Sequence, residues 1–523
     1  MSLWQEHLVV VPVVLPLAAG ALMLLFDERR HALKAALGVA STLLLVAAAI
    51  ALLRLADASA TQVYRLGDWA APFGIVLVAD RLSAVMVLLA GVLAFAALVF
   101  SLARWSRAGP RFHSLIQFLL MGVNGAFLTG DLFNLFVFFE VFLAASYGLA
   151  LHGSGTARVG ASLHYIAVNL TASLLFLIGA SLLYGVTGTL NMADLAVRVP
   201  AVPAGDRMLL EAGAAILGVA FLVKAGMWPL CFWLPGTYSA ASAPAAAFFA
   251  ILTKVGVYAV LRIWLLLFGA EAGASTGFGA DVLVVGGMAT LAFGIVGMLA
   301  AQDLSRLAAF GLLVSSGTLL AAIGTGQIAV TGAALYYLVV STLGASAFFL
   351  LIELVERGRT PGANVLAITA EAFGDIDEEA PEAEVGIAIP ATMAILGLSF
   401  ACCALLLAGL PPLPGFIAKF ALLAALLGPD PIQAPAWALL VLLTLSGLAA
   451  AIATVRAGIR IFWASPELSV PRVDVLEMAP IAALLVLCLA LTVAAGPAMR
   501  YMQDTAQSLH APRGYMQDVL SPR

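Results

Sequence analysis

The chain has 523 residues, of which 63% are hydrophobic and 10% charged, with a net charge of −4 and a mean hydropathy of +1.07. Because soluble domains carry about 25% charged residues, this composition excludes an ordinary soluble enzyme and indicates a polytopic membrane protein. No basic patch interleaves with aromatic residues, so nucleic acid is not expected as a partner, whereas membrane lipid is. The four cysteines lie in apolar runs without CxxC spacing, so we expect no iron–sulfur cluster, zinc site or other cofactor.

The apolar runs predict an all-α fold with about fourteen transmembrane helices, since each run reaches about 20 residues. The first run lacks a preceding basic region and is expected to be a retained span, not a cleaved signal. An even number of spans places both termini on one side of the membrane. The expected spans are 8–26, 32–53, 82–103, 112–129, 131–150, 160–184, 208–230, 242–268, 281–301, 304–324, 329–355, 386–427 with a break near 409, 435–463 and 474–496.

Basic residues are biased toward alternate loops, and this bias predicts the orientation. Short cytoplasmic loops are enriched in lysine and arginine, so the richer set is expected to be cytoplasmic and both termini outside. The richer set contains Arg29, Arg30, Lys34, Arg104, Arg107, Arg111, Arg158, Arg306, Arg357, Arg359, Arg456, Arg460 and Arg472.

One strongly acidic segment, residues 371–384, falls on the expected cytoplasmic side. Such a segment is either a solvated linker or a docking surface for a partner, and the sequence leaves both open. The tail repeats the letters YMQD at residues 501–504 and 515–518, which is compatible with a helix lying at the membrane interface.

Lysine is the informative residue. The chain has four lysines, and three of them lie inside apolar spans, whereas the arginines lie mostly near span ends. A charged side chain at the bilayer centre costs about 2.5–3.5 kcal/mol on insertion scales, so these positions require a reason. Lysine can lose its proton when it is desolvated and arginine cannot, so buried groups that exchange protons are expected to be lysines. The three are Lys224, Lys254 and Lys419.

Prolines interrupt two of the lysine-bearing spans. Proline deletes a helical hydrogen bond, and in lipid the freed backbone groups need protein or water partners. A broken, lysine-bearing span in each half of the chain suggests two repeats with binding positions near the bilayer midplane, as in many transporters. The predicted breaks are at Pro229 and Pro235 in the first half and at Pro411, Pro412 and Pro414 in the second.

Glu140 lies in the middle of the fifth span, and we predict Lys224 as its partner because opposite charges within about 4–6 Å stabilise each other. Opening of this pair would release a proton from the lysine; the alternative is a static ion pair that fixes helix packing. Lys254 and Lys419 are expected to be buried proton carriers, against the alternative that they extend to an interface. His164 either relays protons or hydrogen-bonds a neighbouring helix. Asp131 is expected to cap the helix that follows it.

Several motifs in order resemble the antiporter-like membrane subunits shared by respiratory complex I and Mrp cation/proton antiporters. They are VKAGMWPLCFWLPGTYSAASAP at 223–244, TKVGVYAVLR at 253–262, the glutamate of the fifth span, and GLPPLPGFIAKF at 409–420. Within that family, HYIAVNLTASLLFLIGASLLYGVTGTLNMADLA at 164–196 is most similar to the D-subunit group of Mrp-type Na⁺/H⁺ antiporters.

The resemblance implies two inverted five-helix repeats and a hydrated row of charged residues across the membrane plane. It implies an organisation into residues 1–111 with three helices, a first repeat at 112–268, a second at 269–465, and a last helix with tail at 466–523. Glu140 and Lys224 match the family's glutamate–lysine pair, Lys254 its connecting lysine, and Lys419 the lysine of its second broken helix.

The function that the resemblance implies is secondary transport. The chain would be a proton-carrying subunit of a bacterial inner-membrane complex that exchanges Na⁺ for H⁺ together with other subunits, and not itself an enzyme. The alternative is a proton-pumping subunit of a complex I-type or hydrogenase redox enzyme. The cation site stays open, with Asp131, Glu140 and Glu353 as oxygen-bearing candidates. So does the Na⁺ or K⁺ preference.

One position departs from the family. Relatives often carry a histidine in the eleventh span where this chain has Val340. A proton path through the second half would then depend on water, Ser341, Thr342 or Tyr337.

Overall fold

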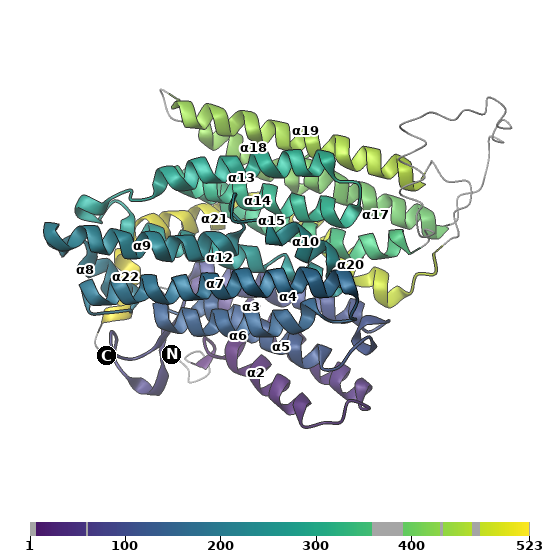
Figure 1. Cartoon of the computed structure of the whole chain (residues 1–523), viewed down its shortest axis with the longest axis horizontal. Coiled ribbons are helices and arrows are strands. Elements are labelled where there is room, and N and C mark those ends of the chain that lie inside the picture. The colour runs from purple at the N-terminus through teal and green to yellow at the C-terminus, as the bar shows by residue number, and fades with distance from the viewer. Residues whose placement is uncertain (1–6, 59–60, 358–390, 429–431, 463–470, 522–523) are drawn as a thin grey trace.

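The computed structural model describes residues 7–58, 61–357, 391–428, 432–462 and 471–521. Within these ranges the chain is a bundle of long helices that run side by side along the longest axis of the molecule (Figure 1). The predicted all-α membrane fold is confirmed. The acidic segment 371–384 lies outside the described residues.

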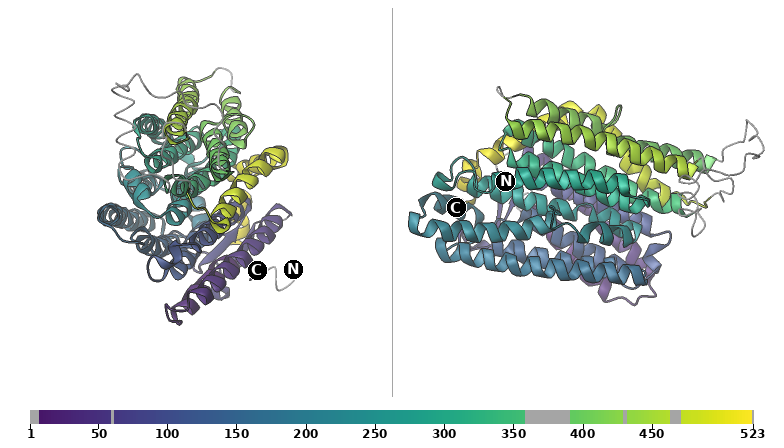
Figure 2. Two further views of the ribbon diagram at one scale, coloured as in Figure 1. Left: turned by 90° about the vertical axis from the view of Figure 1, so that its right-hand side faces the viewer. Right: turned by 45° about the horizontal axis from the view of Figure 1, so that its top comes forward.

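The N-terminal part forms one edge of the bundle (Figure 2). A small antiparallel hairpin connects the second and third helices of this part. The hydropathy pattern did not predict it. Buried amides fasten this part to the next helices: Asn124 donates to the Pro12 carbonyl at 3.0 Å, and Gln117 donates to the Gly38 carbonyl at 3.2 Å. The elements are α2 (Val11–Leu24), α3 (His31–Ala58), β1 (Gln62–Arg65), β2 (Val76–Ala79) and α4 (Arg81–Ser101).

The middle and C-terminal parts complete the bundle. The helices that follow α4 are α5 (Phe112–Leu128), α6 (Leu132–Ala150), α7 (Thr156–Thr187), α8 (Met192–Arg198), α9 (Ala204–Ala225), α10 (Trp233–Ala240), α11 (Ala243–Phe249) and α12 (Leu252–Phe268). The remaining helices are α13 (Ala280–Ala300), α14 (Leu304–Gly324), α15 (Ile328–Glu356), α17 (Ala391–Ala408), α18 (Pro414–Leu426), α19 (Ala434–Phe462), α20 (Val475–Val493), α21 (Ala495–His510) and α22 (Arg513–Leu520).

Twelve helical segments of the described chain are long and apolar enough to cross a membrane. The sequence predicted about fourteen spans, and the difference of two arises because α2 and α5 are shorter apolar helices of 14 and 17 residues. α12, α14 and α15 are buried along nearly their whole length, whereas α3, α19 and α20 bury one face and leave the other for lipid or partners. The interior of the bundle therefore includes α12, α14 and α15.

The two ends of the bundle differ. The first described residues, the hairpin, α8 and the C-terminal helices α21 and α22 gather at one end, which we call the terminal end (Figure 1). The loops that join α4 to α5 and α6 to α7 lie at the opposite end, the loop end. Asp131 accepts a hydrogen bond from the Asn134 backbone at 2.8 Å and thus caps α6, as predicted.

α13 and α14 pack with their backbones in close contact because glycines lie at their crossing. An added Cβ on Gly287 would lie 2.4 Å from the Ala321 nitrogen, and one on Gly317 would lie 2.5 Å from the Leu291 nitrogen. Small residues allow this approach, which contributes dispersion contacts where lipid offers no hydrophobic drive between helices.

We predict that Gly287→Ala lowers the stability of the solubilised protein by about 1–3 kcal/mol, because its new methyl group forces the two backbones apart. Gly185→Ala is the matched control, since its Cβ would meet nothing within 4 Å on the surface of α7. Thermal unfolding in detergent, followed by size-exclusion chromatography, measures both variants. Equal melting temperatures for the two would contradict the proposed crossing.

Candidate functional site

The first helix break separates α9 from α10. α9 ends at Ala225 and is capped by Gly226, which adopts the left-handed conformation with φ 75°, and residues 227–232 are not helical. Pro229 lies inside this connection. Pro235 does not break a helix: it lies in the first turn of α10, where its missing N–H has no intrahelical acceptor to lose. A second interruption, which the prolines did not indicate, separates α10 from α11 at residues 241–242.

The second break separates α17 from α18. Gly409 follows α17 with φ 71°, and a Cβ there would lie 2.5 Å from Cδ of Lys419. Pro411 and Pro412 lie in the connection. Pro414 is the first residue of α18, a position where its fixed φ favours the start of a helix.

Lys224 lies in the last turn of α9, directly before the first break, and its side chain is 4% exposed. Within the described chain its Nζ has no hydrogen-bond partner. It lies 5.0 Å from the ring centre of Phe139, within cation–π range. The Lys224 ammonium thus contacts an aromatic ring, and the opposite charge of Glu140 acts on it only through space.

Glu140 follows Phe139 on α6 and is half-buried. Its carboxylate accepts a hydrogen bond from the Ser173 hydroxyl of α7 and acts on Lys224 only through space. The described residues contain no ion pair between Glu140 and Lys224 at contact distance. The predicted partners are therefore neighbours, but in this conformation they are separated.

Lys254 starts a chain of hydroxyl groups that crosses three helices. Its side chain is fully buried on α12, and Nζ donates to the Ser315 hydroxyl of α14 at 2.8 Å. The Ser315 and Ser341 hydroxyl oxygens are 2.9 Å apart, and Ser341 lies on α15. Ser341 also has the Leu338 carbonyl within 3.3 Å, which completes a series of donors that begins at the lysine.

A cavity continues from these hydroxyl groups toward the second break. Its volume of about 40 Å³ is enough for about three water molecules, since one needs about 10–15 Å³. Ser315, Ser341 and the Tyr337 side chain supply polar lining, and Val340 lines it as well. Gly415, at the start of α18, belongs to the far wall. The cavity thus lies beside Val340, where the sequence predicted that a proton path would depend on water or on hydroxyl groups.

Lys419 lies on α18 and is 7% exposed. Its Nζ donates to the Ala408 carbonyl, the last residue of α17, at 3.1 Å and to the Ser446 hydroxyl of α19 at 3.2 Å. The carbonyl end of a helix carries partial negative charge and unpaired acceptors, so the break itself provides part of the binding site for this ammonium.

Together these helices form one contact series across the bundle. α6 packs on α7, α7 on α9, α9 on α12, α12 on α14, α14 on α15, and α15 on α18. The end-on view in Figure 2 shows helices from the middle of the chain, coloured blue to green, packed beside the purple N-terminal edge. The predicted residues Glu140, Lys224, Lys254 and Lys419 all lie on helices of this series. We call these four residues the lysine row.

His164 does not belong to the lysine row. It lies on an exposed face of α7, where its ring meets the exposed Phe232 edge-on at 6.3 Å between centroids. The prediction of an internal proton relay through His164 therefore has no support in the geometry. Helical periodicity explains why: Tyr165, its neighbour, takes the buried position on this helix.

A separate pocket opens at the loop end of the bundle. It has a volume of about 380 Å³ and is lined by Arg104, Arg158, Glu353 and Arg357, with Ser239 from α10. The Trp105 indole donates to Glu353 at 2.6 Å, and Arg158 donates to the Ala240 carbonyl at 2.8 Å. The pocket thus reaches the interruption between α10 and α11.

Sequence reasoning missed the hydroxyl partners Ser173, Ser315 and Ser446. Each lies on an apolar helix without a pattern that distinguishes it from serines that bond their own helix. Their only signal is three-dimensional, namely a charged group on the facing helix. The described residues contain no cluster of histidine, cysteine and carboxylate side chains that would hold a metal ion.

Comparison with known proteins gives a consistent result. Residues 129–448 match the family model described as NADH:quinone oxidoreductase/Mrp antiporter, transmembrane. A protein of Rhizobium meliloti (strain 1021), described as the probable D subunit of a K⁺/H⁺ antiporter, is 59% identical over 100% of this chain and 99% of its own length. The D subunit of the Na⁺/H⁺ antiporter of Alkalihalophilus pseudofirmus is 35% identical over 99% and 100% of the two chains.

Solved structures agree on the fold. A chain in the structure of the Mrp complex from Dietzia sp. DQ12-45-1b matches with a TM-score of 0.80 and 28% identity, and the match covers 100% of both chains. A chain of respiratory complex I from Thermus thermophilus matches with a TM-score of 0.77 over 98% of this chain and 100% of its own. Its identity of 22% shows a shared fold alone.

Proposed function

The chain belongs to the family of NADH:quinone oxidoreductase and Mrp antiporter membrane subunits, and from this premise we propose that it carries protons laterally along the lysine row within a multi-subunit monovalent cation/proton antiporter. The observation that carries the proposal is the bonded chain from Lys254 through Ser315 to Ser341, which continues into a cavity beside the second break. The chain is a transporter subunit of the bacterial inner membrane, with residues 112–268 and 269–465 as its two repeats.

In this proposal the separated Glu140 and Lys224 are one state of a switch. Lys224 without a hydrogen-bond acceptor is poised to give up its proton, because a buried ammonium is costly unless it is paired. Closure of the pair would require Glu140 to leave Ser173 and would make the ammonium form favourable again. The charge on Glu140 would thereby set the proton occupancy of Lys224.

The pocket at the loop end would connect this switch to water. Its residues coincide with the loops that the basic-residue bias predicts to be cytoplasmic, and it reaches the interruption between α10 and α11. The terminal end of the bundle would then face outward, with both termini. Mobile protons would enter beside α10, pass Lys224 and Lys254, and continue through the cavity to Lys419.

We predict that Glu140→Gln, Lys224→Met and Lys254→Met each reduce cation-dependent proton exchange by at least about tenfold, a barrier change of about 1.4 kcal/mol, because each removes a charge state that the path needs. The assay is ΔpH-dependent dye fluorescence in everted vesicles from a host that lacks its own antiporters and expresses the whole complex.

Lys34→Met is the matched control. Lys34 is as buried as the row lysines, at 3% exposure, but it lies at the loop end and pairs with Glu28 at 2.7 Å. We expect this variant to keep exchange activity per assembled complex. Loss of exchange in Lys34→Met equal to that in Lys254→Met, or normal exchange in Lys254→Met, contradicts the lysine row.

The hydroxyl chain makes a separate prediction. Ser315→Ala and Ser341→Ala should each slow exchange about fivefold, the effect of roughly 1 kcal/mol for one hydrogen bond. The double variant should be no slower than either single variant, because both interrupt one series path. Ser346→Ala is the control, since its buried hydroxyl on α15 has no hydrogen-bond partner within the described chain. Additive losses, or an equal loss in the control, refute the series path.

The transported cation is tested directly. The relative at 59% identity is described for K⁺, whereas the family resemblance implied Na⁺ exchange and left the preference between Na⁺ and K⁺ open. We expect vesicles with the complex to exchange K⁺ for protons at least as fast as Na⁺ at equal concentration. The reason is that the K⁺ relative is 59% identical to this chain, whereas the Na⁺ relative is 35% identical. Exchange with Na⁺ alone would favour the interpretation from the motifs, and exchange with neither cation would reject the antiporter proposal.

A further inference from the structure

The buried face of α12 carries more than the central lysine. Lys254, Tyr258 and Arg262 follow one another at four-residue intervals and therefore lie on one side of the helix. Their exposed fractions are 0%, 4% and 6%. With a rise of 1.5 Å per residue, Arg262 lies about 12 Å from Lys254 along the axis, toward the terminal end. A polar line thus leads from the lysine row to one surface of the bundle.

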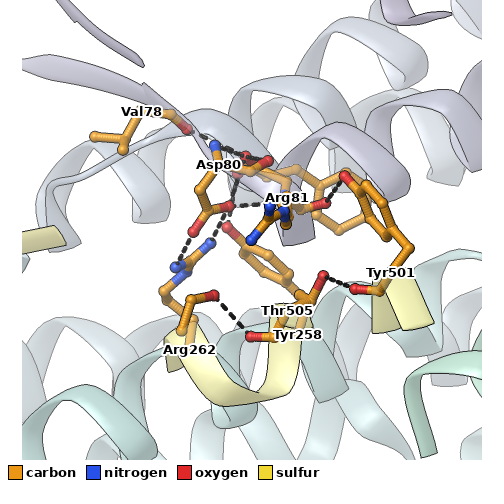
Figure 3. Close-up of polar contacts among 10 residues, drawn as sticks. Val78, Asp80, Arg81, Tyr258, Arg262, Tyr501 and Thr505 are labelled. Atoms are coloured by element: carbon orange, nitrogen blue, oxygen red, sulfur yellow. Dashed lines mark hydrogen bonds and ion pairs between the residues drawn. The ribbon is translucent and has the colours of Figure 1, made fainter. Parts of the chain in front are cut away.

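Arg262 is held by Asp80, a residue that the lysine row does not use. Two hydrogen bonds join the guanidinium to the Asp80 carboxylate, at 2.5 and 2.7 Å, and Figure 3 shows the two groups pointing toward one another beside Tyr258. Asp80 also caps α4 by accepting from the Ser83 backbone at 2.9 Å. Burial alone would raise the pKa of the Asp80 carboxyl, but the charge of Arg262 holds it below its ordinary value.

Aromatic side chains enclose this ion pair. The Arg262 guanidinium lies 5.6 Å from the ring centre of Tyr258 and 5.3 Å from that of Tyr515, which belongs to α22. The Tyr258 hydroxyl donates to the Phe127 carbonyl at the end of α5, at 2.6 Å. Tyr501 of α21 donates to the Arg81 carbonyl at 3.1 Å, beside the pair. The C-terminal helices therefore cover the outer side of the polar line.

We propose that the Asp80–Arg262 ion pair is a gate at the terminal end of the bundle. It closes a branch of the proton path that leaves the lysine row at Lys254, and when closed it separates Lys254 and Tyr258 from water on that side. The proposal rests on the proposed function, because a gate requires a proton-carrying lysine behind it. In the described structure the pair is closed, since Asp80 at the start of α4 bonds Arg262 of α12, whose guanidinium lies over the Tyr515 ring.

The chemistry of the three side chains gives each a distinct part. The guanidinium stays protonated, so Arg262 cannot carry a proton, but its positive charge opposes the approach of another cation. Asp80 compensates that charge while the pair is closed. The Tyr258 hydroxyl can accept and donate a proton without a net change, and it lies one helical turn from Lys254. Opening of the pair would let water reach this hydroxyl.

Removing the charge of Arg262 alone and removing the charge of Asp80 alone should have opposite effects. Arg262→Gln removes the positive barrier and leaves the Asp80 carboxylate, so the passive proton conductance of vesicles without added cation should rise about tenfold. Asp80→Asn leaves an uncompensated guanidinium, so antiport should fall about tenfold without a leak. Tyr258→Phe should slow antiport, and in combination with Arg262→Gln it should abolish the leak.

Asp57→Asn is the matched control, because it breaks the exposed Arg81–Asp57 pair at the same end of the bundle. We expect it to leave both conductance and antiport unchanged. Activities are normalised to assembled complex, and Tyr258→Phe, which removes one oxygen, keeps the test valid should the charge variants assemble poorly. Tight vesicles with Arg262→Gln, a leak that persists with Tyr258→Phe, or an equal leak with Asp57→Asn each overturn the gate.

Failure of the gate and failure of the proposed function give different results. If only the gate is wrong, Lys254→Met still reduces antiport at least about tenfold while Arg262→Gln vesicles hold their gradient. If the function is wrong, Lys254→Met leaves antiport intact. Agreement with both proposals requires that the Arg262→Gln leak disappears in the Lys254→Met background.

Discussion

The interaction on which the rest of this structure depends is the stabilisation of an ammonium group inside a bilayer. Each buried lysine costs about 2.5–3.5 kcal/mol before any partner is found. The fold offers a different partner to each: an aromatic face and a distant carboxylate for Lys224, a serine hydroxyl for Lys254, and a helix-end carbonyl with a serine for Lys419. The helix breaks, the buried hydroxyls and the close packing of the middle helices all bring such partners to places that lipid would otherwise leave apolar.

These partners also explain why the interior helices are arranged as they are. α14 must approach α12 closely enough for Ser315 to reach Lys254, and α15 must approach α14 closely enough for Ser341 to reach Ser315. α13, which packs on α14 through glycines, supports α14 from outside this contact. Packing and polar chemistry are thus parts of one constraint, since a shift of α14 would change both hydrogen bonds at once.

The sequence predicted the elements whose signal is local. Spans follow from hydropathy, lysine burial follows from its position within a span, and the two breaks follow from proline. It failed where orientation or distance decides the outcome. Pro235 was predicted to break a helix but lies in the first turn of α10. His164 was a candidate proton relay but lies on an exposed face of α7. The separation of Glu140 from Lys224 depends on Ser173, whose hydroxyl no pattern distinguishes.

The three lysines also differ in what their surroundings favour. Lys254 and Lys419 donate to oxygen acceptors, which stabilise the ammonium form, whereas Lys224 has no hydrogen-bond acceptor within the described chain. On the proposed function, the structure is therefore a state in which the first carrier is the one ready to release its proton while the next two hold theirs. A proton can enter this row only after Lys254 passes its own onward, through Ser315, toward the cavity. Directionality then arises from the unequal partners of otherwise identical side chains, and Glu140 is the group whose movement reverses that inequality.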